Sequence, residues 1–366
     1  MTRIVVDAQQ VPKELSGVAR LVEQIGAAVA DPRIAELPLT LRCAQDVAPT
    51  LAAMFPTGVR VVAPLTQSRP VWRRLIRQQL LQPLRDGRDT ILICPGDQGP
   101  LWGRARVVLL SNDVRRLVRP DTAGRAERLF YRLIQPSSIR RADVVLTISE
   151  FSKDEIARAT GRTDGVTVVA IHPEPVAQTP SEAAPGAHLL AVSAVRPYKG
   201  FDHLVEAVIA LGDRAPRTVI VGSHDIDVEP MRARLREHGM EERVDFRGWV
   251  SEAELQTLYR TAYATVCPSA YEGYGLPVAE SLAQGVPVVA SDIPPHTEVG
   301  GDAVRYFRAG DAGDLTRALG ELLDAPQEHA RLAHAALERS RTLARRTPRW
   351  PQAIGDAIAA VRDRAR

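Results

Sequence analysis

The chain has 366 residues, of which 45% are hydrophobic and 25% charged, and its formal net charge is only +3. This length favours two domains over one, and the composition is that of an ordinary globular protein. The mild charge, without a basic stripe interleaved with aromatic residues, gives no support to a nucleic-acid-binding protein. No apolar run approaches about 18 residues, and the N-terminus enters a strand at once, so we expect neither a membrane-spanning segment nor a signal peptide.

Three cysteines, Cys43, Cys94 and Cys267, lie far apart in the chain and form no C-x-x-C pair. Cys94 and Cys267 fall in apolar, strand-like runs, where we expect buried thiols rather than disulfides. Free thiols are typical of a reducing compartment, so the protein is predicted to be cytoplasmic. The eight histidines show none of the spacings of a metal site, and we expect no metal.

Short β-branched runs alternate with helical patterns along the first half of the chain, which predicts a parallel α/β sheet. The strands are expected at residues 3–7, 39–43, 59–63, 90–94, 107–111, 144–148 and 166–171. A helix is expected from about residue 17. Gly17 at its start is a candidate phosphate contact, because helix N-termini present unpaired N–H groups to anions.

Residues 172–187 are rich in proline, alanine and polar residues without periodicity, which is typical of a linker between domains. Beyond them the alternation resumes, with strands expected at residues 189–195, 218–221, 244–247, 264–267, 286–290 and 304–307. From about residue 329 the pattern is helical to the end. We therefore expect one domain over residues 1–175, with the linker 172–187, and a second over residues 188–345.

Residues 271–280, YEGYGLPVAE, carry the clearest chemical pattern in the chain. Glu272 and Glu280 flank seven residues that include Gly273 and Gly275, after a buried strand and at the start of a helix. Such a loop leaves N–H groups at a helix N-terminus for an anion, and carboxylates accept hydrogen bonds from sugar hydroxyls. The alternative is an ordinary strand-to-helix turn, where acidic residues suit the helix dipole.

This stretch resembles the E-x7-E motif of the retaining GT-B glycosyltransferases of the GT4-like family, whose common form is E-G-F/Y-G-L-P-x-x-E. The resemblance is strongest over residues 191–303 and weaker over nearly all of the rest. It implies two Rossmann-like domains facing across a cleft, and a nucleoside-diphosphate sugar as donor with no metal or other cofactor. It also implies that residues 346–366 form a helix that returns to the first domain, with a kink at Trp350 and Pro351.

The resemblance further implies roles for individual residues in the second domain. Glu280 would hold the ribose hydroxyls, and Val250 would lie beside the nucleotide base. The alternative for that stretch is a strand followed by a helix that Ser251 caps. Glu272 would act in catalysis and hold the donor sugar and phosphate together with the main chain of Gly273, Tyr274, Gly275 and Leu276.

Three further positions bear on the chemistry. Lys199 matches the lysine with which the family neutralises the leaving diphosphate, which is the main catalytic need. The family's arginine would fall at Ala194, so Arg196 is its candidate substitute, and a solvated arginine is the alternative. Asn112 stands where the family often has histidine. It forms hydrogen bonds but is no general acid; since the leaving phosphate can accept the acceptor's proton, Asn112 stays a candidate catalytic residue.

We therefore expect a glycosyltransferase acting on a hydroxyl of a glycan, lipid-linked or small-molecule acceptor. Arginine-rich amphipathic stretches at residues 72–82 and 115–141 suggest a peripheral contact with the inner membrane face, and a solvated face is the alternative. Two other classes remain open. Asn112 and the displaced Arg196 would also suit a non-catalytic partner of another transferase, and the same architecture could serve a sugar-nucleotide isomerase.

Overall fold

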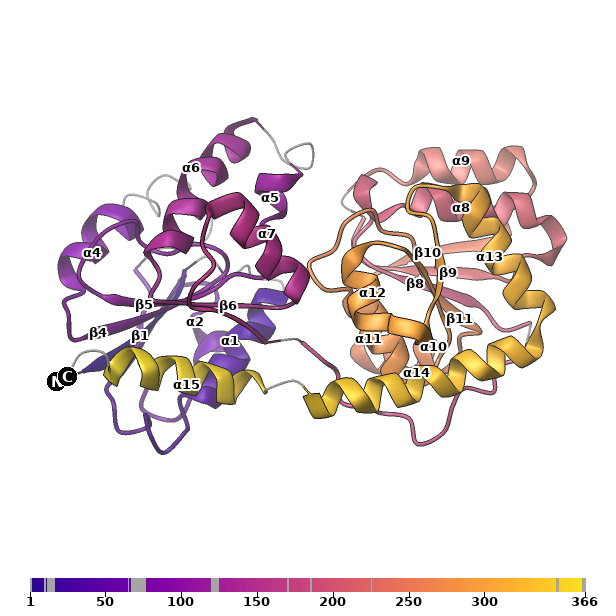
Figure 1. Cartoon of the computed structure of the whole chain (residues 1–366). Coiled ribbons are helices and arrows are strands. Elements are labelled where there is room, and N and C mark those ends of the chain that lie inside the picture. Colours follow the sequence, from indigo (N-terminus) through magenta and orange to yellow (C-terminus); the bar gives the residue numbers. More distant parts are fainter. Residues whose placement is uncertain are drawn as a thin grey trace. The chain divides into compact units, whose positions relative to one another are not determined.

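The computed structural model describes residues 2–9, 11, 17–64, 66, 77–119, 125–169, 171–184, 186–224, 226–346 and 349–363. The chain divides into two compact units (Figure 1). Unit 1 comprises residues 1–170 and 348–366, and unit 2 comprises residues 171–347. Each unit is built on its own parallel sheet, as the alternation of strand and helix patterns predicts.

Unit 1 contains a seven-stranded sheet in the order β3-β2-β1-β4-β5-β6-β7. Its strands are β1 (Arg3–Ala8), β2 (Leu39–Cys43), β3 (Arg60–Val62), β4 (Thr90–Pro95), β5 (Arg106–Leu110), β6 (Val144–Thr147) and β7 (Val166–Val168). Its helices are α1 (Gly17–Ala28), α2 (Ala48–Ala52), α4 (Gln82–Arg85), α5 (Arg115–Val118), α6 (Arg125–Arg141), α7 (Glu150–Thr160) and α15 (Trp350–Asp363), with a π-helical turn at Arg77–Leu81.

The central strands of unit 1 are apolar on both faces, because helices cover both faces of a parallel sheet. β4, with the sequence TILICP, is buried along its whole length. Val5 of β1 pairs with Thr40 of β2 on one side and Leu92 of β4 on the other. The order of strands reverses between β1 and β4, and such a switch point is where the loops of doubly wound sheets hold ligands.

The last helix, α15, belongs to unit 1 and lies beside α1 (Figure 1). It buries Trp350 and Ile354, and Arg106 of β5 donates a hydrogen bond from Nη1 to the carbonyl of Val361 at 3.0 Å. Pro351 occupies the first turn of α15, where a missing N–H leaves no partner unpaired. The residues at which we expected a kink thus form a helix start.

Unit 2 contains a six-stranded parallel sheet in the order β10-β9-β8-β11-β12-β13. Its strands are β8 (Leu189–Val192), β9 (Thr218–Val221), β10 (Val244–Gly248), β11 (Ala264–Cys267), β12 (Val288–Ser291) and β13 (Arg305–Phe307). Its helices are α8 (Phe201–Leu211), α9 (Glu229–Glu237), α10 (Glu252–Thr261), α11 (Leu276–Ala283), α12 (Pro294–Gly300), α13 (Ala312–Asp324) and α14 (Pro326–Arg346), and the 3-10 turns are Pro197–Lys199, Gly212–Arg214, Glu241–Arg243 and Gly301–Ala303.

The switch point of unit 2 lies between β8 and β11. These strands pair at Leu189–Ala264 and Leu190–Thr265, and β8 ends at Val192, three residues earlier than predicted. Val195 still forms an isolated bridge with His224 on the other side. β8 is shorter than expected, and beyond Leu190 it pairs with β9 but no longer with β11.

Residues 172–187, which we expected to link the two domains, lie in unit 2. The main-chain N–H groups of Val176 and Ala177 donate to the carbonyl of Ala283, and that of Ser181 donates to the carbonyl of Gly285. These bonds hold the segment against the end of α11. This segment shows no periodicity in its sequence and is ordered by carbonyl groups at the end of α11. Such a distant partner cannot be recognised from the local sequence.

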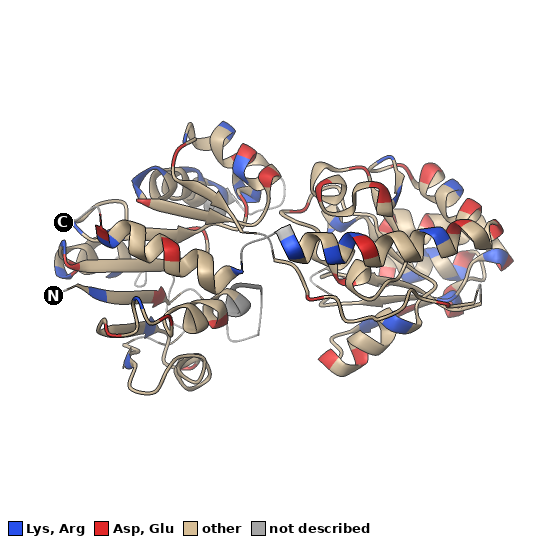
Figure 2. Ribbon diagram, turned by 60° about the horizontal axis from the view of Figure 1, so that its bottom comes forward, with Lys and Arg blue, Asp and Glu red and all other residues tan. Residues whose placement is uncertain are grey.

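Charges of both signs are distributed over the two units (Figure 2). All three cysteines are buried free thiols, including Cys43, for which we had made no prediction. Within the described ranges, no helix combines the length and the apolar character that crossing a bilayer requires.

Gly200 lies in the loop after β8, next to Pro268 in the loop after β11. Its φ is +68°, and a Cβ atom there would lie 2.2 Å from the carbonyl oxygen of Pro268. We expect Gly200→Ala to destabilise unit 2 by about 3 kcal/mol or more in urea unfolding, because it adds a backbone clash to the cost of a left-handed alanine. Gly239→Ala is the control: its φ is +65° with nothing within 4 Å, so it should lose roughly 1 kcal/mol. An equal loss of unfolding free energy in the two variants would contradict the close approach of Gly200 to Pro268.

Candidate active site

The motif at residues 271–280 forms the predicted strand, loop and helix. β11 ends at Cys267, and α11 begins at Leu276 with Pro277 in its first turn. Gly275 precedes the helix with φ +98°, a left-handed conformation that favours glycine. The loop is mostly buried, and its end presents the first-turn N–H groups of α11, which have no partner inside the helix.

Glu272 is bound by two groups from different loops. The ammonium group of Lys199 donates to its Oε1 at 2.7 Å, and the hydroxyl of Ser269 donates to the same oxygen at 2.7 Å. The side chains of Glu272 and Lys199 are each only 13% exposed. The structure therefore brings together two residues that the sequence singled out for catalysis.

The carboxyl group of Glu272 is ionised at neutral pH. Burial by itself raises the pKa of Glu272, but the positive charge of Lys199 and its hydrogen bond oppose burial, and the pKa ends below its usual value. A buried ion pair needs such additional hydrogen bonds, because desolvation otherwise outweighs the attraction. Glu272 is thus an anion held in place before any ligand arrives.

Lys199 reaches the motif because the two loops leave neighbouring strands. It ends the 3-10 turn after β8, and the N–H of Ala270 donates to the carbonyl of Tyr198 at 2.8 Å. Arg196, the candidate substitute for the family's arginine, precedes this turn and donates from Nη1 to the hydroxyl of Tyr198 at 3.2 Å. Arg196 is half-buried, and whether it contacts a diphosphate stays a prediction.

Glu280 lies on α11 and accepts a hydrogen bond at Oε2 from the hydroxyl of Tyr259 on α10, at 2.7 Å. Tyr259 is 1% exposed, and burial raises the pKa of its hydroxyl well above the usual value, so it stays a donor. The sequence analysis did not identify Tyr259. The available signal was a tyrosine next to Leu258 near the end of the helix that precedes the motif strand.

Tyr274 of the motif loop is also held through its hydroxyl, which lies 2.6 Å from Nδ1 and 2.9 Å from Nε2 of His172. Burial, with the charge of Arg339, lowers the pKa of His172 to about 4, so its ring is neutral at pH 7 and can accept this hydrogen bond. His172 is the second residue of unit 2, and no local pattern indicates its contact with the loop.

Val250, expected beside the nucleotide base, follows β10 and packs against the cluster that includes Leu258 and Tyr259. Ser251 caps α10 as predicted, because its hydroxyl accepts from the N–H of Glu254 at 3.2 Å. Trp249 beside them is 69% exposed. These contacts put Val250 near Tyr259, the partner of Glu280.

In unit 1, Gly17 lies in α1, whose described residues begin there. Asn112 follows β5, and its N–H donates to Oδ1 of Asp97 at 2.9 Å, while its own Oδ1 is buried with no hydrogen-bond partner in the described part of the chain. Asp113 accepts from the N–H of Arg115 at 2.9 Å and so caps the next turn. Asn112 is therefore oriented by a carboxylate that the sequence analysis missed.

Asp97 lies in the loop after β4, at the switch point of unit 1. Its φ is 65°, and among the described residues no other non-glycine side chain stands on a positive φ. Burial and the nearby charge of Asp113 raise its pKa to about 7. A strained backbone and a displaced pKa together are more frequent at functional sites than elsewhere.

No described cluster of three or more His, Cys, Asp and Glu side chains has the proximity of a metal site. The stretch at residues 72–82 lies partly outside the described residues, which resume at Arg77.

Comparison with known proteins bears on both units. Residues 180–339 match the family model described as glycosyl transferases group 1. The O-antigen chain mannosyltransferase RfbU of Salmonella typhimurium is 26% identical over 223 residues, covering 60% of this chain and 62% of that protein. The MMP alpha-(1->4)-mannosyltransferase of Mycolicibacterium hassiacum is 35% identical over 144 residues, covering 38% of this chain and 35% of that protein.

A solved structure resembles the whole chain. Anabaena Alr3699/HepE in complex with UDP and glucose has a TM-score of 0.73 at 15% identity, covering 99% of this chain and 100% of that one. The fold is thus GT-B, with two Rossmann-like α/β domains, as predicted. The chain is similar to the group 1 glycosyltransferases over the domain at residues 180–339. It spans about three fifths and about one third of the length of the two curated relatives.

The pKa of Asp97 predicts how stability depends on pH. Its folded pKa of about 7 exceeds the unfolded value of 3.8, so ionisation costs folding free energy that grows as pH rises from 3.8 to 7. We expect Asp97→Asn, which also tolerates a positive φ, to be more stable than wild type by roughly 1 to 2 kcal/mol at pH 8. In urea titrations this gain in the free energy of unfolding should vanish at pH 4. A gain that is the same at pH 4 and pH 8 would mean that asparagine is favoured there only because it adopts the positive φ more easily than aspartate does.

Proposed function

We propose that this protein transfers a sugar from a nucleoside-diphosphate donor to a hydroxyl group of an acceptor, with retention of configuration at the anomeric carbon. The observation that carries this proposal is the buried Lys199–Glu272 pair beside the N-terminus of α11, within a domain of the group 1 glycosyltransferase family. The diphosphate of a nucleotide sugar requires a cation and unpaired helical N–H groups, and the hydroxyls of its sugar require a carboxylate.

Charge balance explains how the pair would act. Lys199 is already compensated by Glu272, so an incoming diphosphate competes with this carboxylate for the ammonium group. Glu272 then gains capacity to accept hydrogen bonds from the sugar hydroxyls, while Lys199 and the first turn of α11 stabilise the diphosphate. Glu280, held by Tyr259, accepts from the ribose hydroxyls.

The bond changes follow from this arrangement. The bond between the anomeric carbon and the diphosphate oxygen breaks, and the acceptor oxygen attacks the same face of the sugar. The departing phosphate oxygen takes the acceptor's proton, so Asn112 need not supply or remove one. Stabilising negative charge on the leaving group is the largest effect to be expected of Lys199. We propose that this charge compensation makes the reaction independent of metal.

Mannose is the sugar we propose, because the two curated relatives named above are mannosyltransferases. The name of the first also supports a glycan acceptor, as in the assembly of a surface polysaccharide. The structural neighbour with UDP and glucose makes glucose the alternative. We propose that the acceptor binds to unit 1 near Asn112 and Asp97, whose polar groups are suited to hydroxyls.

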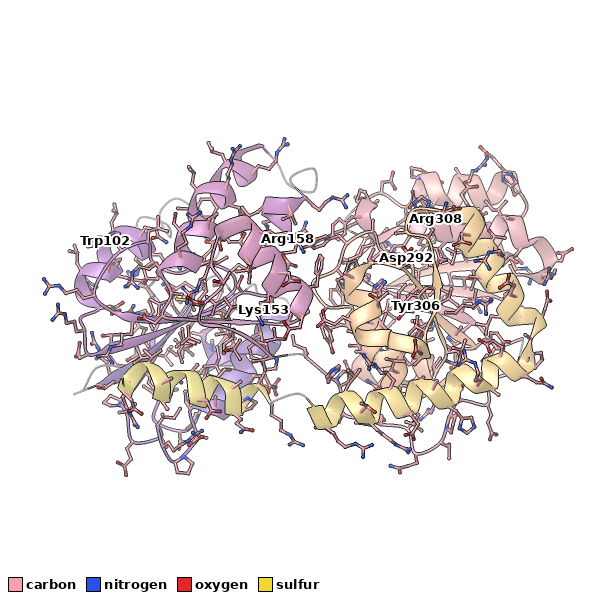
Figure 3. All side chains as sticks on the ribbon, viewed as in Figure 1. Trp102, Lys153, Arg158, Asp292, Tyr306 and Arg308 are labelled. Carbon is pink, nitrogen blue, oxygen red and sulfur yellow. The ribbon has the colours of Figure 1, made fainter. Side chains whose placement is uncertain are left out.

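A groove of 1170 Å³ between α5, α6 and α7 supports the proposed contact with a membrane. Five arginines line this basic groove: Arg116, Arg128, Arg132, Arg140 and Arg158, the last projecting from α7 (Figure 3). Leu129 and Leu133 in the same lining are 61% and 60% exposed. Cations with exposed apolar side chains are the composition that binds anionic lipid surfaces.

Nucleotide binding is the first test of this function. We expect one of UDP, GDP, ADP and dTDP to bind in calorimetry, and Glu280→Ala to weaken it at least tenfold, because the ribose loses its acceptor. Tyr259→Phe should weaken binding less, since the carboxylate remains. Absence of binding by all four would contradict the donor site.

Transfer assays then test the ion pair, with GDP-mannose and UDP-glucose among the donors. We expect Glu272→Ala and Lys199→Ala each to reduce transfer by a factor of about 100 or more without unfolding the chain. Asp324→Ala is the control, since it breaks an exposed pair with Arg214 in the same unit. Turnover near wild type in either site variant would refute the assigned roles.

The same assay separates the other two classes. A non-catalytic partner would neither transfer nor hydrolyse any donor. A sugar-nucleotide isomerase would convert the donor without acceptor and release no nucleoside diphosphate.

Vesicle sedimentation tests the membrane contact. The Arg128→Glu, Arg132→Glu double variant should bind vesicles of phosphatidylglycerol about 30-fold more weakly than wild type, from roughly 1 kcal/mol for each basic residue. The control is Arg260→Glu, Arg308→Glu, which makes the same charge change at exposed positions of unit 2. Equal loss in both variants would mean that overall charge, rather than the basic groove, attracts the chain.

A further inference from the structure

A buried histidine that the proposed mechanism does not use lies behind the motif loop. His296 is in the first turn of α12, directly after β12, and is 1% exposed. The hydroxyl of Tyr306 on β13, labelled in Figure 3, donates to the carbonyl of His296 at 3.2 Å. This hydrogen bond from β13 holds the backbone of His296 in place.

The ring of His296 packs directly against Gly275. A Cβ atom on Gly275 would lie 3.0 Å from Cδ2 and 3.7 Å from Nε2 of the ring. The imidazole thus occupies the space next to the left-handed residue that begins α11. The ring is therefore in contact with the turn that presents the first N–H groups of this helix.

The two ring nitrogens have different surroundings. Nδ1 lies 3.0 Å from the carbonyl oxygen of Ser291, which can only accept, so Nδ1 carries the hydrogen. Nε2 is buried and has no hydrogen-bond partner among the described residues. Burial lowers the pKa of His296, against the opposing charge of Glu272, and Lys199 lowers it further. The ring is therefore neutral at pH 7, with its proton on Nδ1.

A chain of hydrogen bonds leads from His296 to the catalytic carboxylate. The hydroxyl of Ser291 lies 3.1 Å from Nδ1 and donates to the carbonyl of Ser269 at 2.5 Å. The hydroxyl of Ser269 in turn donates to Glu272 at 2.7 Å. His296 therefore packs directly against Gly275 at one end of the motif loop. It is linked to Glu272 at the other end through the hydrogen bonds of Ser291 and Ser269.

We propose that His296 is a positioning residue for the donor site, which it holds in shape as a neutral imidazole with the proton on Nδ1. This inference rests on the proposed function and adds to it a residue that sets how well the loop binds the donor. Protonation at Nε2 adds a positive charge that attracts Glu272, so the carboxylate is drawn away from the hydroxyls of the donor sugar, from which it is proposed to accept hydrogen bonds. Donor binding therefore weakens when His296 is protonated.

Three substitutions separate the parts of this role. His296→Asn keeps a donor near the position of Nδ1, His296→Gln keeps a polar group near the position of Nε2, and His296→Phe keeps the ring without either nitrogen. His329→Asn is the matched control. It removes another buried histidine of unit 2, which lies 2.8 Å from the carbonyl of Tyr263 and away from the loop.

The measurements are nucleotide affinity by calorimetry, and KM for the donor and kcat between pH 5.5 and 8, with thermal stability followed in parallel. We expect His296→Phe and His296→Gln to raise the donor KM about tenfold, with kcat changed less than threefold. His296→Asn should restore KM to within about threefold of wild type and show less weakening at acid pH. His329→Asn should lower thermal stability and leave KM unchanged.

The inference is overturned if His296→Phe binds donor as wild type does, or if all four variants, His329→Asn included, weaken binding alike. It is also overturned if the pH profile of His296→Asn matches that of wild type. A wild-type protein that binds none of the four nucleotides refutes the proposed function and this inference together. A wild type that binds while the His296 variants are unaffected refutes only the inference.

Discussion

The ion pair between Lys199 and Glu272 is the contact on which the rest of the site depends. It joins the loops that follow β8 and β11, the two strands between which the order of the sheet reverses. Burying opposite charges costs desolvation free energy. The hydroxyl of Ser269 offsets part of this cost by donating a further hydrogen bond to the carboxylate. Gly200 serves the same contact, since its missing side chain lets one loop pass against the carbonyl of Pro268.

Around this pair, Glu280, Tyr274 and Gly275 of the motif each contact a residue from another segment of unit 2. Tyr259 binds Glu280, His172 binds Tyr274, and the ring of His296 packs against Gly275. The two histidines have lowered pKa values and are neutral, so they orient the loop without adding charge beside Lys199. The resulting site has its carboxylates oriented before a ligand binds, which reduces the entropy lost on binding.

The two units use their switch points differently. In unit 2 a cation and a carboxylate neutralise each other, which suits a ligand with a charged diphosphate and a neutral sugar. In unit 1 Asp97 binds the main chain of Asn112 and has a raised pKa, so that loop offers hydrogen bonds with little fixed charge. This difference agrees with a donor held by unit 2 and a hydroxyl-bearing acceptor at unit 1.

The sequence by itself determined the local features: two parallel α/β sheets, strands such as residues 218–221 and 264–267, the cap at Ser251, the proline at position 277 in a first helical turn, and the E-x7-E stretch between a strand and a helix. These follow from periodicity and backbone preference over a few residues, which act before any tertiary contact. Only the tertiary structure decided which residues contact one another in the site. Lys199 and Glu272 are 73 residues apart, and His172 and Tyr274 are 102 apart. Such pairs meet because the order of strands makes β8 and β11 neighbours, and no local pattern encodes that order.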